Sequence, residues 1–312
     1  MDITPRRATQ LTAIKGIHMK QRFHGNVIGM SALAMLALST AVLADNKMDD
    51  VTITSKKLDN NTYMFIGAGG NIGVSAGSDG ILIIDDQFAP LAEKITASLN
   101  DIQAGSPKYI VNTHYHGDHT GGNAHFGATG TILAHHNVLK RLSADSKTPK
   151  SALPVITFAE NISIHFNQDT LEVIHLGPGH TDGDSVVMWQ QANIVHMGDL
   201  FFKDRFPYID LAAGGSVMGY RDNVSAILDK LNDKTKVIPG HGDLASKNEL
   251  LKFKHMLDDS INWMRGEIEK GHDLATIKQM GVPAEYKTWG WTFISADKWI
   301  ETLYQDLNAK AD

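Results

Sequence analysis

The most concentrated group of side chains that could do chemistry lies in residues 113–122, THYHGDHTGG. Three histidines and one aspartate, His114, His116, Asp118 and His119, fall within six consecutive positions directly after an apolar run. The pattern indicates a strand that ends in a tight, glycine-flanked turn. His114 and His116 are two residues apart and would point the same way if the strand continued. Asp118 and His119 would then turn toward a second metal position. The turn therefore predicts two adjacent metal ions; a polar surface turn is the alternative.

Three further donors occur later in the chain. His180, Asp199 and His241 each come just after an apolar run and directly after a glycine. Glycine lets the backbone turn sharply and approach a ligand closely. Enzymes with alternating strands and helices collect functional side chains at the carboxyl ends of strands. We therefore expect these three donors to converge on the 113–122 turn.

The elements that must position these donors can be read from hydrophobic periodicity and turn residues. Strands are predicted over residues 51–57, 63–66, 72–76, 81–84, 109–112, 131–134, 162–166, 171–176, 185–189, 194–197 and 237–240. Helices are predicted over residues 90–104, 136–144, 222–231, 247–270 and 295–307, and Ser246 to Glu249 fits a capping box before the fourth. In this order, a β-meander followed by helices occurs twice. It predicts an α/β fold: a four-layer αββα sandwich of two mixed β-sheets packed face to face, with helices on the outer sides.

The donor order resembles the metallo-β-lactamase superfamily. The pattern H-x-H-x-D-H is followed by single donors at 180, 199 and 241, and the local sequences GHTDG (179–183) and PGHG (239–242) are similar to those of the family. The resemblance covers most of the chain from the first strands to residue 241. It implies that His114, His116 and His180 hold one zinc ion, that Asp118, His119 and His241 hold the other, and that Asp199 is a bridging carboxylate, as in glyoxalase II-like enzymes.

One departure from the family pattern concerns Asp199. The lactamases of one subclass have cysteine there, followed three residues on by a substrate-binding lysine. This chain has Asp199 and Phe202, and its Lys203 is one position off. The departure argues against membership of that subclass.

The implied donor set defines the chemistry. Imidazole and carboxylate ligands suit two Zn²⁺ per chain, with manganese or iron as the alternatives. Two such ions could share a water and lower its pKa from ~15.7 to about 7, which gives a metal-bridging hydroxide able to attack a carbonyl or phosphoryl centre. Asp118 is the expected catalytic group, because it could orient that hydroxide or carry a proton.

Residues 1–44 differ from the rest of the chain. A basic start at residues 19–24, an apolar run over 27–42 and small residues before Asp45 are typical of a secretory signal peptide. Residues 1–18 are read as an upstream extension, with Met19 as a plausible start, and an uncleaved anchor is the alternative. The remaining residues 45–312 are predicted to form a single hydrolase domain that is periplasmic or secreted, with no stable membrane span after cleavage.

Composition excludes several other functions. Without residues 1–44 the chain keeps 24 positive and 34 negative side chains, a net charge of −10, which disfavours nucleic acid as a partner. The absence of cysteine excludes disulfides, thiolate ligands and a cysteine nucleophile. The expected partner is a small-molecule substrate, and the oligomeric state stays open.

Other features have two interpretations each. The G-x-S-x-G match at residues 73–77 is read as structural, because a hairpin follows it instead of a helix. The pair at 85–86 is either support for the ligand histidines or a solvated strand end, and loop 67–71 is either a flap or a hairpin loop. The aromatic residues at 201, 202, 206 and 208 are expected to line a pocket. Packing is the default for Trp289 and Trp291, and for the histidines at 135, 136, 175 and 196 a capping, core or supporting role is expected.

The sequence thus predicts a secreted, dinuclear zinc-dependent hydrolase. Cleavage of a β-lactam amide is the leading hypothesis, because the cell envelope is where such a hydrolase would matter. A thioesterase or lactonase is the alternative that Asp199 favours. A non-hydrolytic metal-binding protein is the alternative from another class.

Overall fold

A computed structural model describes residues 48–309. The described residues all belong to one compact unit. The expected signal peptide, and the choice between Met1 and Met19 as the start, lie outside the described residues. Among the helices of the described range, none is both long and apolar enough to cross a bilayer.

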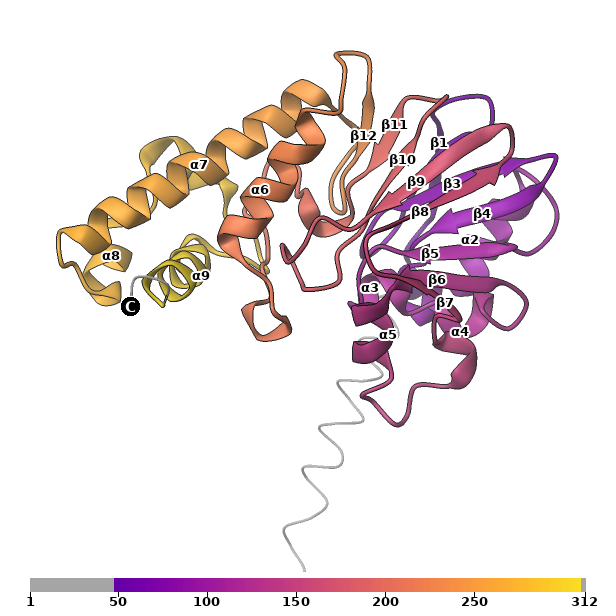
Figure 1. The fold of residues 1–312 in the computed structure, drawn as a ribbon, viewed down its shortest axis with the longest axis horizontal. Helices are drawn as coiled ribbons and strands as arrows, with labels where there is room; N and C mark the ends of the chain where they lie inside the picture. The colour runs from indigo at the N-terminus through magenta and orange to yellow at the C-terminus, as the bar shows by residue number, and fades with distance from the viewer. Residues whose placement is uncertain (1–47, 310–312) are drawn as a thin grey trace, which may run out of the picture. The chain divides into compact units, whose positions relative to one another are not determined.

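The first sheet has seven strands paired in chain order (Figure 1). The pairs are antiparallel from β1 to β4 and parallel from β4 to β7. Its strands are β1 (Thr54–Lys57), β2 (Thr62–Ile66), β3 (Ile72–Gly77), β4 (Gly80–Ile84), β5 (Tyr109–Asn112), β6 (Thr131–His135) and β7 (Ile156–Phe158).

The second sheet has six strands in the order β13-β12-β11-β10-β9-β8. All its pairs are antiparallel except β11 with β12. Its strands are β8 (Asn161–Phe166), β9 (Asp169–Ile174), β10 (Val186–Trp189), β11 (Ile194–His196), β12 (Lys236–Ile238) and β13 (Ala245–Ser246).

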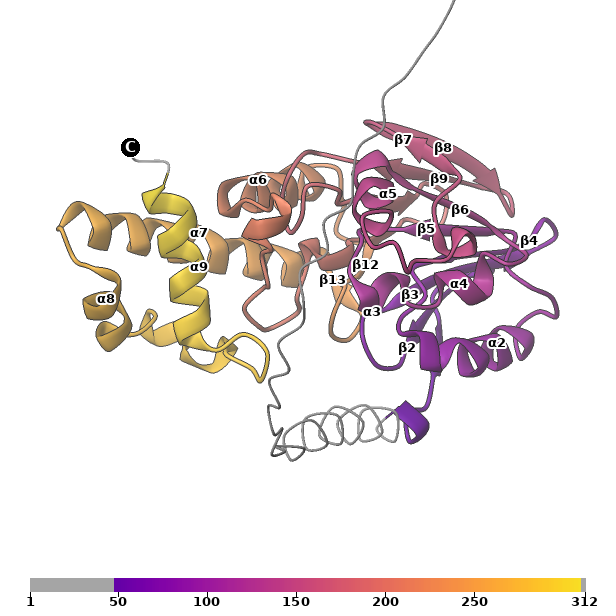
Figure 2. The same cartoon turned by 90° about the horizontal axis from the view of Figure 1, so that it is seen from below.

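Helices flank both sheets. On the side of the first sheet lie α2 (Ala92–Asn100), α4 (Asn123–Phe126) and α5 (His136–Leu142), and α2 is seen on its outer face in Figure 2. With the second sheet lie α6 (Val217–Leu228), α7 (Lys247–Glu269), α8 (Leu274–Met280) and α9 (Ala296–Asn308). Both parts of the capping box expected at the start of α7 are present.

Three apolar cores separate the four layers. Alternate residues of a strand face opposite sides of a sheet. In β4, Ile83 packs toward α2, whereas Leu82 and Ile84 pack into the core between the sheets. In the second sheet, Ile238 joins that middle core while Val237 packs with the C-terminal helices. The four-layer αββα sandwich expected from the sequence is therefore confirmed.

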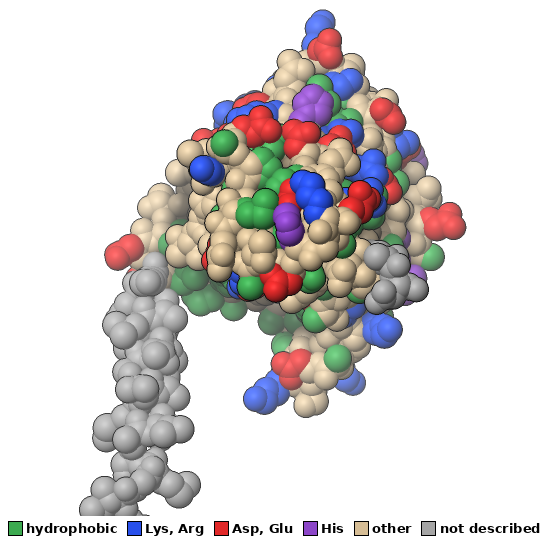
Figure 3. Space-filling view, turned by 90° about the vertical axis from the view of Figure 1, so that its left-hand side faces the viewer, with side chains coloured by type: hydrophobic (Ala, Val, Ile, Leu, Met, Phe, Trp, Pro, Cys, Tyr) green, Lys and Arg blue, Asp and Glu red, His purple; other side chains and the backbone are tan. Residues whose placement is uncertain are grey.

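The surface over the C-terminal helices carries charges of both signs. Figure 3 looks onto this end of the molecule, where Lys and Arg side chains are interspersed with Asp and Glu. This face has no single continuous basic patch in the part of the chain that the structure describes, and it offers no large field for a polyanion.

A stacked histidine pair joins the two sheets. The rings of His135, at the end of β6, and His175, just after β9, lie 3.8 Å apart at 13°. The His135 side chain caps α5 by accepting from the Asn137 backbone N–H. Burial, followed by the charges of His175 and His136, lowers the pKa of His135 to about 4. Burial also lowers the pKa of His175.

This pair predicts acid sensitivity. Because the pKa of His135 is lower in the folded chain than the ordinary 6.5, the unfolded chain takes up the proton first. The stabilising contribution of neutral His135 is therefore complete above pH 6.5 and is lost between pH 6.5 and about 4. Over this range the free energy of unfolding falls by up to about 1.4 kcal/mol per pH unit. In urea unfolding, the free energy of unfolding of His135→Gln should fall less steeply with pH over this range than that of the parent. The exposed His165→Gln should match the parent, and equal slopes for all three would contradict the assignment.

Candidate metal centre

The residues expected to bind metal lie where strands end. β5 ends at Asn112, two of the histidines follow in the connecting segment, and Asp118 and His119 lie on the short helix α3 (Gly117–Thr120). Asp199 lies on the 3-10 helix η3 (Gly198–Leu200), directly after β11. His180 follows β9 and His241 follows β12. All seven predicted donors meet in one region, in two adjacent sets.

The first set contains three imidazole nitrogens. His116 Nδ1 lies 3.1 Å from His114 Nε2 and 2.8 Å from His180 Nε2. Asp199 Oδ2 faces the same nitrogens, 3.4 Å from that of His180 and 3.8 Å from that of His114. The donor atoms of these four residues lie within 4.8 Å of one another.

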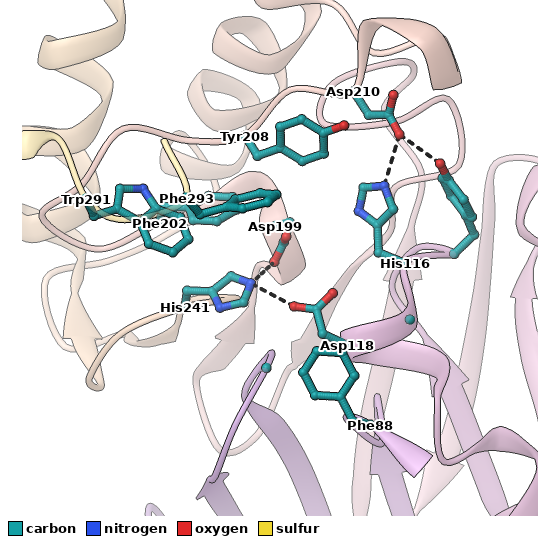
Figure 4. A pocket seen from close by; sticks show the side chains of 13 residues that line it. Phe88, His116, Asp118, Asp199, Phe202, Tyr208, Asp210, His241, Trp291 and Phe293 are labelled. Carbon is teal, nitrogen blue, oxygen red and sulfur yellow. Dashed lines mark hydrogen bonds and ion pairs between the residues drawn. The ribbon is translucent and has the colours of Figure 1, made fainter. Parts of the chain in front are cut away.

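The second set contains Asp118, His119 and His241, whose donor atoms also lie within 4.8 Å of one another. Asp118 Oδ2 is 3.4 Å from His241 Nε2 and 3.7 Å from His119 Nε2. Asp199 Oδ1 is 3.0 Å from His119 Nε2 and 3.3 Å from His241 Nε2, and Figure 4 shows His241 between the two carboxylates. One oxygen of Asp199 therefore faces each set, so this carboxylate could be shared by cations held in both.

Unsatisfied buried atoms test whether a metal fits. Within residues 48–309, His119 Nε2 and Asp199 Oδ1 are buried and lack a hydrogen-bond partner, although they are only 3.0 Å apart. A buried polar atom without a partner costs about 1–3 kcal/mol. A cation held between these atoms would satisfy both, so the residues present fit a metal ion.

Two glycines give the donors their space. A Cβ on Gly70 would lie 2.1 Å from the His119 ring, and one on Gly240 would lie 2.1 Å from Asp199 Oδ1. Loop 67–71 is also tied down, because Asn71 Nδ2 donates to the carbonyls of Pro239 and Gly242. The loop is therefore a fixed hairpin connection, and one of its glycines, Gly69, lines the cavity.

The second nitrogen of several ligand histidines is held by an acceptor. His119 Nδ1 is 2.7 Å from Asp85 Oδ2, and His180 Nδ1 is 2.7 Å from the Tyr208 carbonyl. His116 Nε2 is 3.1 Å from Asp210 Oδ2. Such partners hold the ring and leave the opposite nitrogen as an acceptor for a metal. The interpretation of residues 85–86 as a solvated strand end is wrong, because both side chains are fully buried. Asp85 faces His119, as a supporting residue would.

The histidines of the two sets differ in the direction of their pKa shifts. Burial lowers the pKa of His180 to about 4 and the pKa of His114 as well, so both rings are neutral and suited to ligation. Burial also opposes charge on His241, but the Asp199 and Asp118 carboxylates outweigh it and raise its pKa to about 9. The carboxylates around the second set thus create a field that favours a positive charge.

Replacing Asp85 tests this support. Asp85→Asn keeps the shape of the side chain but removes the charge that faces His119. The affinity for zinc should fall by roughly 10–100-fold, the usual cost of losing an outer partner. Chelator competition measures it, with Asp101→Asn, exposed at the end of α2, as the matched control. An unchanged affinity in Asp85→Asn would rule out the supporting role.

A cavity of about 690 Å³ opens over the two sets (Figure 4). Besides the metal donors it exposes mostly aromatic side chains. Its lining residues are Gly69, Phe88, Tyr115, His116, Gly117, Asp118, Asp199, Phe202, Tyr208, Asp210, His241, Trp291 and Phe293.

The aromatic residues are divided between cavity and core. Of the four expected to line a pocket, Phe202 and Tyr208 do so, whereas Phe201 and Phe206 are buried in the C-terminal core. Trp289 packs in that core as expected. Trp291 also packs against the core, as expected, and in addition its side chain lines the cavity. The serine of the G-x-S-x-G match, at position 75, is buried inside β3, which confirms the structural interpretation.

Several residues that line the cavity were not predicted to be functional, among them Asp210, Tyr115, Phe88 and Phe293. Asp210 accepts hydrogen bonds from the Tyr115 hydroxyl at 2.7 Å and from His116 at 3.1 Å. Phe88 and Phe293 lie in loops without periodicity, so no pattern marks them.

Comparisons with known proteins agree with this geometry. Residues 59–241 match the family model of the Metallo-beta-lactamase superfamily. The chain is 24% identical over 237 residues to "Metallo-beta-lactamase type 2" of Bacillus sp. (strain 170), covering 70% of this chain and 89% of that protein. It is also 24% identical over 221 residues to the protein of the same name from Bacillus cereus, covering 68% and 84%.

Solved structures share the fold. The metallo-beta-lactamase from Pontibacter korlensis superposes with a TM-score of 0.58 at 19% identity, over 67% of this chain and all of that one. The DIM-1 metallo-beta-lactamase gives 0.58 at 17% identity, over 67% and 99%. Fold and site define a metal-dependent hydrolase of the α/β sandwich class. The chain belongs to the metallo-beta-lactamase superfamily.

Proposed function

We propose that this protein is a dinuclear zinc-dependent hydrolase that cleaves a carbonyl compound. The observation that carries the proposal is the position of Asp199, whose two oxygens each face one complete set of donors. Two sets that share one carboxylate are suited to two ions held side by side. The seven metal ligands of the proposal are His114, His116, Asp118, His119, His180, Asp199 and His241.

When bound, zinc ions supply Lewis acidity and lower the pKa of water. The chain supplies position and proton transfer. The Asp118 side chain is 24% exposed and lines the cavity, whereas Asp199 is only 5% exposed. Asp118 can therefore accept a proton from the attacking water and return it to the leaving group. Asp199 also lines the cavity but is less exposed, and its role in the proposal is to connect the two sets of donors.

Two bond types are candidates for cleavage. The named lactamase relatives support a β-lactam amide. Asp199 in place of a cysteine supports a thioester or a lactone. Lys203 does not supply the cation of the lactamase pattern, because its Nζ lies 2.6 Å from Glu249 Oε1 and it does not line the cavity.

The proposal also includes export. The signal-like pattern over residues 19–44 supports a periplasmic or secreted enzyme. Fractionation of cells expressing the full chain, with the N-terminal sequence of the product, tests it. A product that begins near Asp45 outside the cytoplasm is the expected result, and an intact N-terminus in the cytoplasm would contradict it.

A substrate panel tests the hydrolase proposal. The zinc-loaded protein should be assayed side by side with a chromogenic cephalosporin, a glutathione thioester and a homoserine lactone. We expect turnover of at least one, with about two metal equivalents per chain by elemental analysis. Two bound metals without turnover of any of the three would favour a non-hydrolytic metal-binding protein.

A further inference from the structure

We propose that residues 290–295 make this metal site select an uncharged carbonyl substrate that carries an aromatic or broad apolar group. The segment connects the 3-10 helix η5 (Ala284–Trp289) to α9 and lies beyond the family match, which ends at residue 241. The inference rests on the proposed hydrolase function and names the substrate class of the same site. Of the candidates above it favours an uncharged lactone over a cephalosporin or a glutathione thioester, both of which carry carboxylates.

The segment completes an aromatic wall that begins at a metal donor. The Phe202 ring stacks on the His241 ring with centroids 4.9 Å apart, and the Trp291 ring lies 6.2 Å from Phe202. Phe293 follows at 5.6 Å from Trp291 and packs edge-on against Tyr208 at 5.4 Å (Figure 4). The wall therefore runs from the metal donors to the cavity rim, and a flat apolar group can lie along it.

The wall is preformed. Trp291 Nε1 donates to the Phe206 carbonyl at 2.9 Å, and the Trp291 backbone N–H donates to the Ile294 carbonyl at 2.9 Å. Ile294 is 1% exposed and anchors the segment in the C-terminal core, whereas Phe293 is 52% exposed at the rim. A substrate thus meets a fixed tryptophan face and a rim ring that it can cover, so little ordering entropy is lost on binding.

The charges around the cavity disfavour an anionic substrate. Among the described residues that line it there is no lysine or arginine, while Asp118, Asp199 and Asp210 are present. Three cations lie against rings of the cavity without lining it themselves: Arg141 over Tyr115, Arg205 over Trp291 and Lys298 over Phe293. Arg141 is also paired with Asp182 at 2.7 Å. Bound zinc would offset Asp118 and Asp199, so this preference concerns the outer part of the cavity. A carboxylate there would lose water without gaining a lysine or arginine of the lining as a partner, so an uncharged group is preferred.

Three esters with one leaving group test the inference. They are the 4-nitrophenyl esters of 3-phenylpropanoate, of acetate and of hydrogen succinate, assayed with the zinc-loaded protein. We expect kcat/KM for phenylpropanoate to exceed that for acetate by about 10-fold or more, the range for filling an apolar pocket. We expect the succinate ester, which carries a carboxylate, to be the slowest. Succinate hydrolysed as fast as phenylpropanoate would overturn the inference.

Variants at the rim assign the preference to the segment. Phe293→Ala should reduce the ratio of phenylpropanoate to acetate turnover, and Phe293→Lys should raise the relative rate for succinate. Met280→Lys introduces the same charge at a 49%-exposed site that does not line the cavity, and it should leave all three rates unchanged. Unaltered ratios in both Phe293 variants would overturn the role of the segment.

A binding measurement separates this inference from the hydrolase proposal. Calorimetry compares 3-phenylpropanamide with succinamate on the zinc-loaded protein, and neither needs to be cleaved. Tighter binding of the aromatic amide without turnover of any ester would overturn the hydrolase proposal and support the selectivity. Equal binding of the two would overturn the selectivity whether or not esters are cleaved.

Discussion

Replacing Asp199 with asparagine is expected to lower kcat/KM by more than ~100-fold, beyond the usual cost of losing an outer partner of a metal. Asparagine keeps the size of the side chain but turns an N–H group toward one donor set, and it removes the negative charge between the two sets. Since Asp199 Oδ1 faces His119 and Oδ2 faces His180, both sets are affected by one substitution.

The measurement pairs metal analysis with kinetics. Asp199→Asn should retain about one metal equivalent or fewer, while its far-ultraviolet circular dichroism matches the parent. Asp204→Asn removes an acidic group that is 56% exposed and pairs with Lys252, so it controls for the loss of charge alone. Full activity of Asp199→Asn with two metals bound would show that the carboxylate does not bridge the sets.

Removing the metal should abolish turnover completely, and about two equivalents of zinc per chain should restore it. Stability should fall at the same time, because the buried donor atoms lose the cation that satisfies them. At a free zinc concentration 100 times the dissociation constant, each site adds about 2.7 kcal/mol to the free energy of unfolding. For a chain of this size the Tm should rise by roughly 5–10 °C per site.

A zinc titration of chelator-treated protein, followed by both thermal unfolding and substrate turnover, tests this result. Magnesium, which prefers oxygen ligands and six-coordinate geometry, is the matched control and should restore neither. Turnover that survives exhaustive chelation would exclude metal-dependent hydrolysis. Full restoration of turnover by one equivalent of zinc would show that a single ion is sufficient for catalysis.

The seven donors could be found from the sequence because each has a local signal. An apolar run that ends beside a glycine and a donor can be recognised in the sequence alone. The turn at 113–122 contains four such donors close together. The sequence predicted the position of Asp85 at the end of the buried strand β4, but it left the supporting role as one of two interpretations. Its choice of His119 as partner depends on the parallel pairing of β4 with β5, which no local pattern reveals.

The segments without periodicity were harder. The helix expected over 222–231 begins earlier, at Val217, because the Ser216 side chain accepts from the Gly219 N–H and caps it. The glycines at 214, 215 and 219 interrupt the hydrophobic periodicity, so the sequence did not predict that the helix begins at Val217. The cavity wall was missed for a related reason: Trp291 and Phe293 lie about 50 residues past the last donor, in a connection whose position is set only by tertiary packing.

The anchoring of the 290–295 segment has a consequence for how this scaffold can diversify. Its fixed points are the Phe206 carbonyl and the core position of Ile294, and neither belongs to a metal donor. New side chains at 291 or 293 can therefore alter which molecules are accepted while the reactive centre stays intact. On the proposal above, we therefore expect residues 290–295 to be the part of this chain at which substrate preference can be changed without loss of metal binding.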